Sequence, residues 1–445
     1  MLDAGAYHCG MSAVPVDRAT LIRFLARLGQ AELAAGNAVA LIERDLGQIA
    51  KKNGVEHITV SVLPTVMFLQ FDDGLDHRVQ IALGPYRSGG LRFDQIEGVL
   101  LVARDARAGT LTPSDGLRRL DTVWRMRHRY GDFGFMVGYV LAAVGVALML
   151  RTSLQAVGMV AALGLVAAAL LVVVRRQPAW SAVMPVVVAF IVSFLVAGAY
   201  RAGLHEPVMD LLIPPLIVFL PGSMLTVAIV ELAFANMVSG ATRLVAGFAQ
   251  LVLLAFGMLG GLRMWSAGVP EVARHEPGRL SAWLPWMGVA LFSVGLHLYR
   301  SSRPRSFWWM LCTMLMAYMG QALAGNVLTG SSTAFVGAVV MMLTALTIEY
   351  RFSGPPALIT ILPAFWLLAP GAFGLQSVTG IAMNQTGTAA NILQLLFTLT
   401  AIASGALIGA FLYSGMFHIR RSAWFRKDPT DAHRDPPMEF PERTD

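Results

Sequence analysis

Beyond about residue 130 the chain consists of apolar stretches long enough to cross a lipid bilayer, separated by short polar segments. The hydrocarbon core offers no hydrogen-bond partner, so each stretch must satisfy its own backbone, and a helix does this within one segment. We therefore predict about ten transmembrane helices, near residues 133–150, 155–174, 181–199, 208–229, 243–262, 283–298, 306–324, 332–349, 355–377 and 391–413.

The composition agrees with a polytopic α-helical membrane protein. Hydrophobic residues make up 56% of the chain and charged residues only 14%, which is more apolar surface than one soluble core can hide. The net charge of +7 comes largely from arginines that flank the spans, so it does not indicate a nucleic-acid partner. Cys9 and Cys312 are the only cysteines, so we expect no disulfide framework, no cysteine metal site and no cofactor.

Residues 1–130 are predicted to form a small cytosolic α+β domain. Its first twenty residues lack a basic start followed by an apolar core, so no cleavable signal peptide is expected. The first helical pattern is interrupted at Gly29 and Gly36, and Thr112 is placed to cap the last helix. The predicted elements are helices at 19–51, 93–106 and 113–130 and strands at 57–62, 65–71 and 77–83.

Arginine placement predicts the orientation, because positively charged loops stay on the cytosolic side. A cytosolic amino terminus places inside the loops that contain Arg175, Arg176, Arg243, Arg300, Arg303, Arg305, Arg351, Arg420 and Arg421. Both termini are therefore predicted to be cytosolic. The resulting units are the domain at 1–130, a first membrane repeat at 131–265, an extracytoplasmic loop at 266–282, a second repeat at 283–415 and a polar tail at 416–445.

One motif occurs twice among the apolar stretches. Pro221-Gly222 in the fourth stretch returns as Pro370-Gly371 in the ninth, and another proline precedes each copy, all at one offset of 149 positions (214 to 363, 221 to 370). Because the copies lie five stretches apart, they cross in opposite directions. This predicts a 5+5 inverted repeat, whose matching broken spans are typical of a transporter's binding site.

The first copy has the residues for an anion-binding helix end. Pro221 removes a backbone donor and Gly222 eases unwinding, so we predict that a half-helix begins there. Its first amides, with the hydroxyls of Ser223 and Thr226, would face a group such as a carboxylate. The alternative is a structural kink that only improves packing.

Two acidic residues belong to the same span and are candidates for proton coupling, because a carboxylate at membrane depth is costly to desolvate. Glu231 ends the predicted half-helix, and Asp210 begins the span. Asn236 and Ser239 follow Glu231 and are candidate substrate ligands. Alternatively, Glu231 is a solvated helix end or an ion-pair partner of Arg243, and Asp210 is an interfacial cap.

The second copy offers uncharged polar side chains only. Its candidate substrate ligands are Pro370, Gly371, Gln376, Asn384 and Asn391. Uncharged donors and acceptors suit a polar organic or zwitterionic substrate better than a metal ion, so we expect no metal site. Several of these residues fit loops or interhelical hydrogen bonds equally well.

No catalytic motif identifies the amino-terminal domain as an enzyme. The chain lacks GxSxG, HExxH and the Walker-A phosphate loop, which argues against pumping driven by its own ATP hydrolysis. A structural or regulatory role is therefore expected for this domain. A membrane sensor or hydrolase acting through it is the alternative of another class.

Three segments carry a resemblance to a known family. Residues 219–223 (FLPGS), the acidic Glu231 and residues 239–243 (SGATR) resemble the threonine/serine exporter family. The amino-terminal domain is similar to that family through residues 25–29 (LARLG) and 42–44 (IER). The second membrane half resembles the smaller partner domain that some members carry as a separate chain.

The resemblance implies a secondary exporter of threonine and serine in the bacterial cytoplasmic membrane, driven by the proton gradient or the membrane potential. It implies a transporter rather than an enzyme, with a small-molecule substrate. From the apolar stretches we expect the lipid bilayer as a further partner, and a homo-oligomer is one option. Relatives built from two chains are associated with dicarboxylate export. A dicarboxylate exporter on the same scaffold is therefore the alternative.

Overall fold

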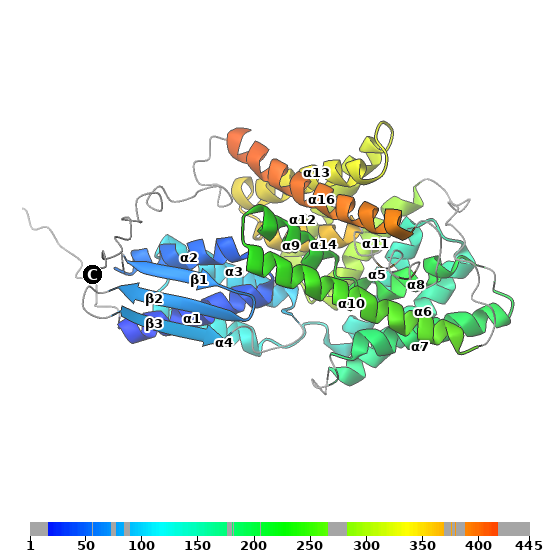
Figure 1. Cartoon of the computed structure of the whole chain (residues 1–445), viewed down its shortest axis with the longest axis horizontal. Coiled ribbons are helices and arrows are strands. Elements are labelled where there is room, and N and C mark those ends of the chain that lie inside the picture. The colour runs from blue at the N-terminus through cyan, green and yellow to red at the C-terminus, as the bar shows by residue number, and fades with distance from the viewer. Residues whose placement is uncertain are drawn as a thin grey trace, which may run out of the picture.

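The structure is a computed structural model, and it is mostly helical (Figure 1). It describes residues 17–55, 57–72, 77–83, 90–175, 180, 182–204, 206–265, 283–368, 375, 379 and 388–416. Within these ranges, four helices and a three-stranded sheet form an amino-terminal part. A bundle of apolar helices forms the rest of the described chain.

The amino-terminal part begins with two helices, α1 (Arg18–Ala35) and α2 (Val39–Lys52). Of the two predicted interruptions, only Gly36 ends a helix. Its φ of +83° is a left-handed conformation that glycine adopts without strain. Gly29 lies inside α1, where it leaves room for the side chain of Met67 on the sheet.

The sheet consists of β1 (Ile58–Val62), β2 (Val66–Asp72) and β3 (His77–Leu83), joined antiparallel in chain order. These strands lie close to the predicted ones. Successive side chains of a strand point to opposite faces, and Met67 and Leu69 of β2 are fully buried. Helix α1 contacts this strand, so the buried face of the sheet packs against the first helix.

Two further helices, α3 (Phe93–Ala108) and α4 (Pro113–Arg125), pack against α1. Thr112 caps α4 as predicted, because its hydroxyl accepts a backbone N–H of the first turn. Helix α4 is shorter than the predicted 113–130. Side chains at the start of α3, Arg92 and Gln95, donate hydrogen bonds to the last carbonyls of α4 and so satisfy its end.

The bundle identifies a multi-pass membrane protein. Within the described residues, seven helices are long and apolar enough to cross a membrane, and a bent helix pair makes eight. Each predicted stretch overlaps one of the bundle helices, two of which (α11 and α14) are shorter. The elements are α5 (Gly131–Met149), α6 (Leu154–Val174), α7 (Met184–Arg201), α8 (Val208–Leu216), η2 (Ile217–Phe219), α9 (Gly222–Ala233), α10 (Met237–Arg263), α11 (Leu284–Tyr299), α12 (Pro304–Ala324), α13 (Ser331–Arg351), α14 (Ala357–Leu367) and α16 (Thr388–Met416).

Helices α5 and α11 cross in direct backbone contact. A Cβ atom on Gly138 would lie 2.7 Å from the carbonyl oxygen of Gly295, and one on Gly145 would lie 2.8 Å from that of Gly288. Small residues permit such an approach between membrane helices. The two glycine pairs run in opposite order along the chain, so α5 and α11 are antiparallel.

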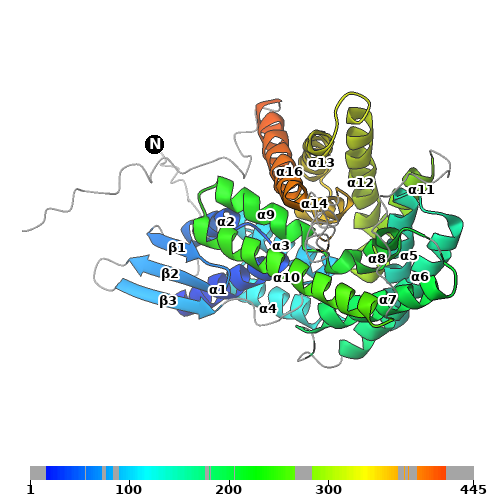
Figure 2. The same cartoon turned by 45° about the vertical axis from the view of Figure 1, so that its right-hand side comes forward.

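The amino-terminal part docks directly onto the bundle (Figures 1 and 2). The backbone N–H of Phe93 donates to the carbonyl of Arg300 at 3.0 Å, and the Arg300 guanidinium donates to the carbonyl of Leu91 at 2.6 Å. The hydroxyl of Ser306 donates to the carboxylate of Glu97 at 2.8 Å. These bonds join the start of α3 to the loop between α11 and α12 and to the first turn of α12.

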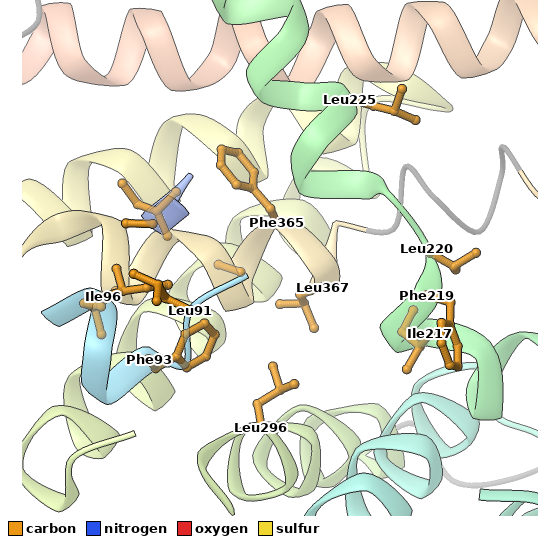
Figure 3. Packing of buried hydrophobic residues seen from close by; sticks show 14 of the residues in the cluster. Leu91, Phe93, Ile96, Ile217, Phe219, Leu220, Leu225, Leu296, Phe365 and Leu367 are labelled. Carbon is orange, nitrogen blue, oxygen red and sulfur yellow. The ribbon is translucent and has the colours of Figure 1, made fainter. Parts of the chain in front are cut away.

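Apolar side chains continue the core across this junction (Figure 3). Leu91 and Phe93 from the amino-terminal part lie in one buried cluster with Leu296 of α11, Phe365 of α14 and Ile217 of the bent pair. Burial of such side chains is worth about 1.5–3 kcal/mol each. The amino-terminal part is therefore held to the bundle by packing as well as by its hydrogen bonds.

Candidate functional site

The fourth predicted span is broken at the predicted proline. Helix α8 carries Pro214 and Pro215 inside it and continues as the short 3₁₀ helix η2. Pro221 then precedes α9, which begins at Gly222, and the two segments are bent by 61°. Because proline donates no backbone hydrogen bond, the helical ladder cannot continue through these positions.

Two backbone carbonyls in the broken segment are satisfied by side chains from other helices. The hydroxyl of Tyr139 on α5 donates to the carbonyl of Pro215 at 2.6 Å. The amide of Gln250 on α10 donates to the carbonyl of Phe219 at 2.5 Å. Non-helical backbone is tolerated at membrane depth only where protein or water supplies such partners. Side chains of α5 and α10 therefore stabilise the bend.

The predicted ligands around the break differ in their surroundings. Thr226 is buried, and its hydroxyl donates to the carbonyl of Gly222 at 2.9 Å, one turn earlier in α9. Ser223 is half-buried in the first turn of the same helix. Asn236 is half-buried and precedes α10. The hydroxyl of Thr226 is therefore already hydrogen-bonded within α9. Ser223 lies in the first turn, where the backbone N–H groups have no partner within the helix.

Glu231 lies at the other end of α9 and is completely buried, so it is not a solvated helix end. One carboxylate oxygen accepts the hydroxyl of Ser239 at 2.6 Å and lies 3.3 Å from Nε of Arg243. The other oxygen accepts the backbone N–H of Val39 at 3.2 Å. The ion pair with Arg243, which was one alternative for this residue, is present, and a contact with the amino-terminal part accompanies it.

A chain of polar contacts continues from this ion pair into the amino-terminal part. The guanidinium of Arg243 donates to the carbonyl of Asn37 at 3.2 Å. The side-chain amide of Asn37 donates to Glu32 of α1 at 3.0 Å. Burial, together with the negative charge of Asp45, raises the pKa of Glu32 to about 8. The turn between α1 and α2 thus connects a buried carboxyl group of the amino-terminal part to Glu231.

Asp210 is not brought to this cluster. It is buried in the first turn of α8, at the end of the broken pair opposite to Glu231. A carboxylate at that position is stabilised by the partial positive charge of the helix amino terminus. The two predicted coupling acids therefore belong to opposite ends of the same span.

The second copy of the motif lies mainly outside the described residues. Pro363 is inside α14, as Pro214 is inside α8. Pro370, Gly371, Gln376 and Asn384 all fall in the ranges that the structure does not describe, and Asn391 is placed only as part of the backbone of α16. Their predicted role as substrate ligands stays a prediction.

A cavity of about 120 Å³ lies where the amino-terminal part meets both membrane halves. Val227 and Val230 of α9, Ile361 and Phe365 of α14 and Leu407 of α16 give it an apolar side. Residues of α2, α3 and the turn between α1 and α2 line it from the amino-terminal part. The broken helix therefore contributes one wall of a space that the amino-terminal part also lines.

The sequence did not identify Asn37 and Val39 as site residues. Nothing in their type or spacing points to Glu231, because the contact joins positions far apart in the chain. One signal existed for Glu32, which occupies the apolar face of a predicted helix where a charged residue is unusual.

Comparison with known proteins identifies a family for this chain. Residues 23–265, more than half of the chain, match the ThrE family, described as threonine/serine exporters. The matched region runs from α1 to the end of α10, so it contains the broken helix, Glu231 and the turn that contacts it. No curated protein and no solved structure matches. The chain belongs to the threonine/serine exporter family.

Proposed function

We propose that the protein is a secondary exporter of small polar amino acids, with threonine and serine as substrates and a proton gradient or membrane potential as the driving force. The observation that carries this proposal is the fully buried Glu231 at the end of a broken, membrane-capable helix pair. Ionisable residues inside membrane helices are costly and are typical of ion and proton pathways. Membership of the exporter family supports the same class.

Protonation of Glu231 would change the contacts that it makes. The ionised carboxylate is stabilised by Arg243 and by the N–H of Val39. A neutral carboxyl group loses its charge attraction for the guanidinium and accepts the amide more weakly. Proton uptake at Glu231 would therefore loosen the turn between α1 and α2 from the bundle, which links the driving ion to movement.

A 5+5 inverted repeat of about ten spans is part of this proposal, and helix pairing supports it. Contacts of α5 with α6 and of α7 with α10 have counterparts in those of α11 with α12 and of α13 with α16. The α7–α10 contact uses Gly257 against the carbonyl of Val186, and the α13–α16 contact uses Gly405 against that of Phe335. Under the proposed repeat, corresponding helices would therefore pack through corresponding glycines.

The crossing of α5 and α11 supports the same symmetry. The glycines of α5 recur in α11 at one offset of 150 positions (138 to 288, 145 to 295). In an antiparallel crossing, a two-fold axis exchanges the two glycine contacts. Arg151 and Ser301, which follow the two helices at the same offset, both have a φ of +55°. A pseudo-two-fold axis through this crossing would give inward- and outward-facing states of similar energy.

The cytosolic placement of the amino-terminal part is also proposed. It contacts the bundle at three places, which are the α9–α10 turn, the α11–α12 loop and the α13–α14 loop. Arg243, Arg300 and Arg351 lie at these three places, and the arginine distribution had placed all of them inside. Agreement among three separate loops supports a cytosolic amino terminus.

Substrate would bind beside the break between α8 and α9. The first amides of α9 and the half-buried Ser223 offer donors to a substrate carboxylate. Asn236 remains a further candidate, whereas Ser239 acts through Glu231, to which its hydroxyl donates. Pro221 and Gly222 would serve by exposing these amides rather than by touching substrate with their side chains.

Glu231→Gln separates coupling from binding. In proteoliposomes, this variant should lose gradient-driven threonine efflux but retain threonine counterflow, because the amide keeps the shape of the side chain and cannot carry a proton. Glu206→Gln is the matched control, since the carboxylate of Glu206 accepts a hydrogen bond from the hydroxyl of Ser153 in a different part of the bundle. Full gradient-driven efflux by Glu231→Gln would remove this residue from the coupling mechanism.

A further inference from the structure

The cytosolic end of the cavity is rich in arginine. Arg44 of α2 and Arg104 and Arg107 of α3 line it, together with two carboxylates, Asp45 and Glu349. Burial raises the pKa of the neighbouring Glu32 to about 8. Arg104 is half-exposed and lies 3.8 Å from Asp105, which is outside the lining, so Arg44 and Arg107 are the two enclosed cations.

The charges of Arg44 and Arg107 are only partly compensated by the protein. Asp45 lies 3.0 Å from Arg107 and 3.5 Å from Arg44, so two guanidinium groups share one carboxylate. The Nε atoms of both arginines are buried and have no hydrogen-bond partner among the described residues. Buried donors of this kind are normally satisfied, and a carboxylate is the group that a guanidinium fork binds best.

The remaining lining groups restrict what such a carboxylate belongs to. Glu349 of α13 lies within electrostatic range of Arg104 and Arg107, and its neighbour Tyr350 borders the same end. The side formed by α9, α14 and α16 is apolar, and no cation lies there among the lining residues. A molecule with one carboxylate, one ammonium group and a small body would match this arrangement. A second carboxylate on the apolar side would have no cation.

We propose that this cavity is the cytosolic entry site of the exporter, and that Arg44 and Arg107 of the amino-terminal part bind the carboxylate of a zwitterionic amino acid there. This inference rests on the proposed export function, and it names the substrate class. It also gives the amino-terminal part a direct role, since that part supplies the cations while the membrane helices supply the apolar wall. The volume of about 120 Å³ is several times what one water molecule needs.

Equilibrium binding of radiolabelled threonine to the purified full-length protein tests the site. Unlabelled threonine and serine should compete, whereas threonine methyl ester, which lacks the carboxylate, and succinate, which lacks the ammonium group, should compete poorly. Arg107→Gln should weaken threonine binding roughly 10- to 100-fold, the usual effect of losing a charged hydrogen bond. Arg107→Lys should recover only part of this loss, because lysine has no planar fork.

A second variant tests the cavity without changing its charge. Ala406 of α16 lines the opposite wall and is buried, so Ala406→Leu should weaken binding by roughly tenfold or more through lost space. Arg27→Gln is the matched control, since Arg27 of α1 pairs with Asp121 at 2.6 Å on the exposed surface and does not line the cavity. Its affinity should equal that of the wild type.

Two results would overturn the site while leaving the export function intact. One is wild-type affinity for threonine in both Arg107→Gln and Ala406→Leu, with export by the wild-type protein. The other is competition by threonine methyl ester as strong as that by threonine. If the wild-type protein neither binds nor exports threonine in proteoliposomes, the proposed function itself fails, and this inference fails with it.

Discussion

Glu32 shows how one buried carboxyl group can make stability depend on pH. It is completely buried, one oxygen accepts the amide of Asn37, and the other oxygen has no partner among the described residues. Burial raises its pKa from 4.5 to about 8. The folded protein therefore holds a proton that the unfolded chain releases between these two values.

This linkage gives a prediction with a definite sign. The stabilisation from Glu32 is fully present below about pH 4.5 and is lost as the pH rises through about 8, by up to about 1.4 kcal/mol per pH unit. Glu32→Gln cannot ionise, so its unfolding temperature should fall less than that of the wild type between about pH 5 and 8. Thermal unfolding in detergent measures this.

Asp121→Asn is the control for the pH measurement. Asp121 pairs with Arg27 at 2.6 Å on the surface, where its side chain is 50% exposed, and such pairs contribute little to stability. The control should follow the wild-type pH profile. Parallel profiles for the wild type and Glu32→Gln would show that Glu32 is already ionised in the folded protein.

Individual residues differ in how far the sequence could predict their roles. Glu231 could be identified because a carboxylate within an apolar stretch of sequence is rare, and its pairing with Arg243 was one of the alternatives. Its contact with Val39 could not be predicted, because a backbone amide carries no residue-type signal. The role of Ser239 as a substrate ligand stays a prediction. Its hydroxyl donates to Glu231, a partner that side-chain type alone does not indicate.

At the level of elements, the close crossing of α5 and α11 makes a quantitative prediction. A Cβ on Gly145 would lie 2.6 Å from the backbone nitrogen of Phe292 and 2.8 Å from the carbonyl of Gly288. Backbone atoms cannot rotate away, so Gly145→Ala should destabilise the protein by about 1–3 kcal/mol. Under the proposed two-fold symmetry, Gly295→Ala should cost a similar amount.

A glycine in open surroundings provides the control for this crossing. A Cβ on Gly158 of α6 would meet no heavy atom within 4 Å. Gly158→Ala should therefore leave stability unchanged or raise it by about 0.5–1 kcal/mol, because alanine favours the helix. Equal unfolding temperatures for all three variants would contradict the close approach of α5 and α11.

The break in the fourth span also has a local cause, which the sequence could predict, and distant partners, which it could not. Proline chemistry alone was enough to place the helix start next to Pro221. The carbonyl partners Tyr139 and Gln250 come from other helices, and sequence patterns could not pair them with the break. The arginine end of the cavity was missed for a similar reason, since α2 and α3 bring Arg44 and Arg107 together only in the folded protein.

For the whole molecule, the position of the amino-terminal part has a mechanical consequence. It is bonded to the first membrane half through Glu231 and to the second through Glu97 and Ser306. Movement of the two halves past one another, as alternating access requires, would strain or break one of these attachments. Both attachments end at a carboxylate, Glu231 in one and Glu97 in the other, so protonation of either side chain would weaken the attachment that it makes.

The proposed orientation makes the last prediction. Val327, in the loop between α12 and α13, is 85% exposed and should face outward, whereas Arg118 of α4, with a side chain 82% exposed, should face the cytosol. With Cys9 and Cys312 replaced by serine, a membrane-impermeant thiol reagent should label Val327→Cys in intact cells. Arg118→Cys should be labelled only after permeabilisation. The arginine pattern and the loops that contact the amino-terminal part predict the same orientation. The reverse labelling would therefore show that every loop lies on the opposite side of the membrane.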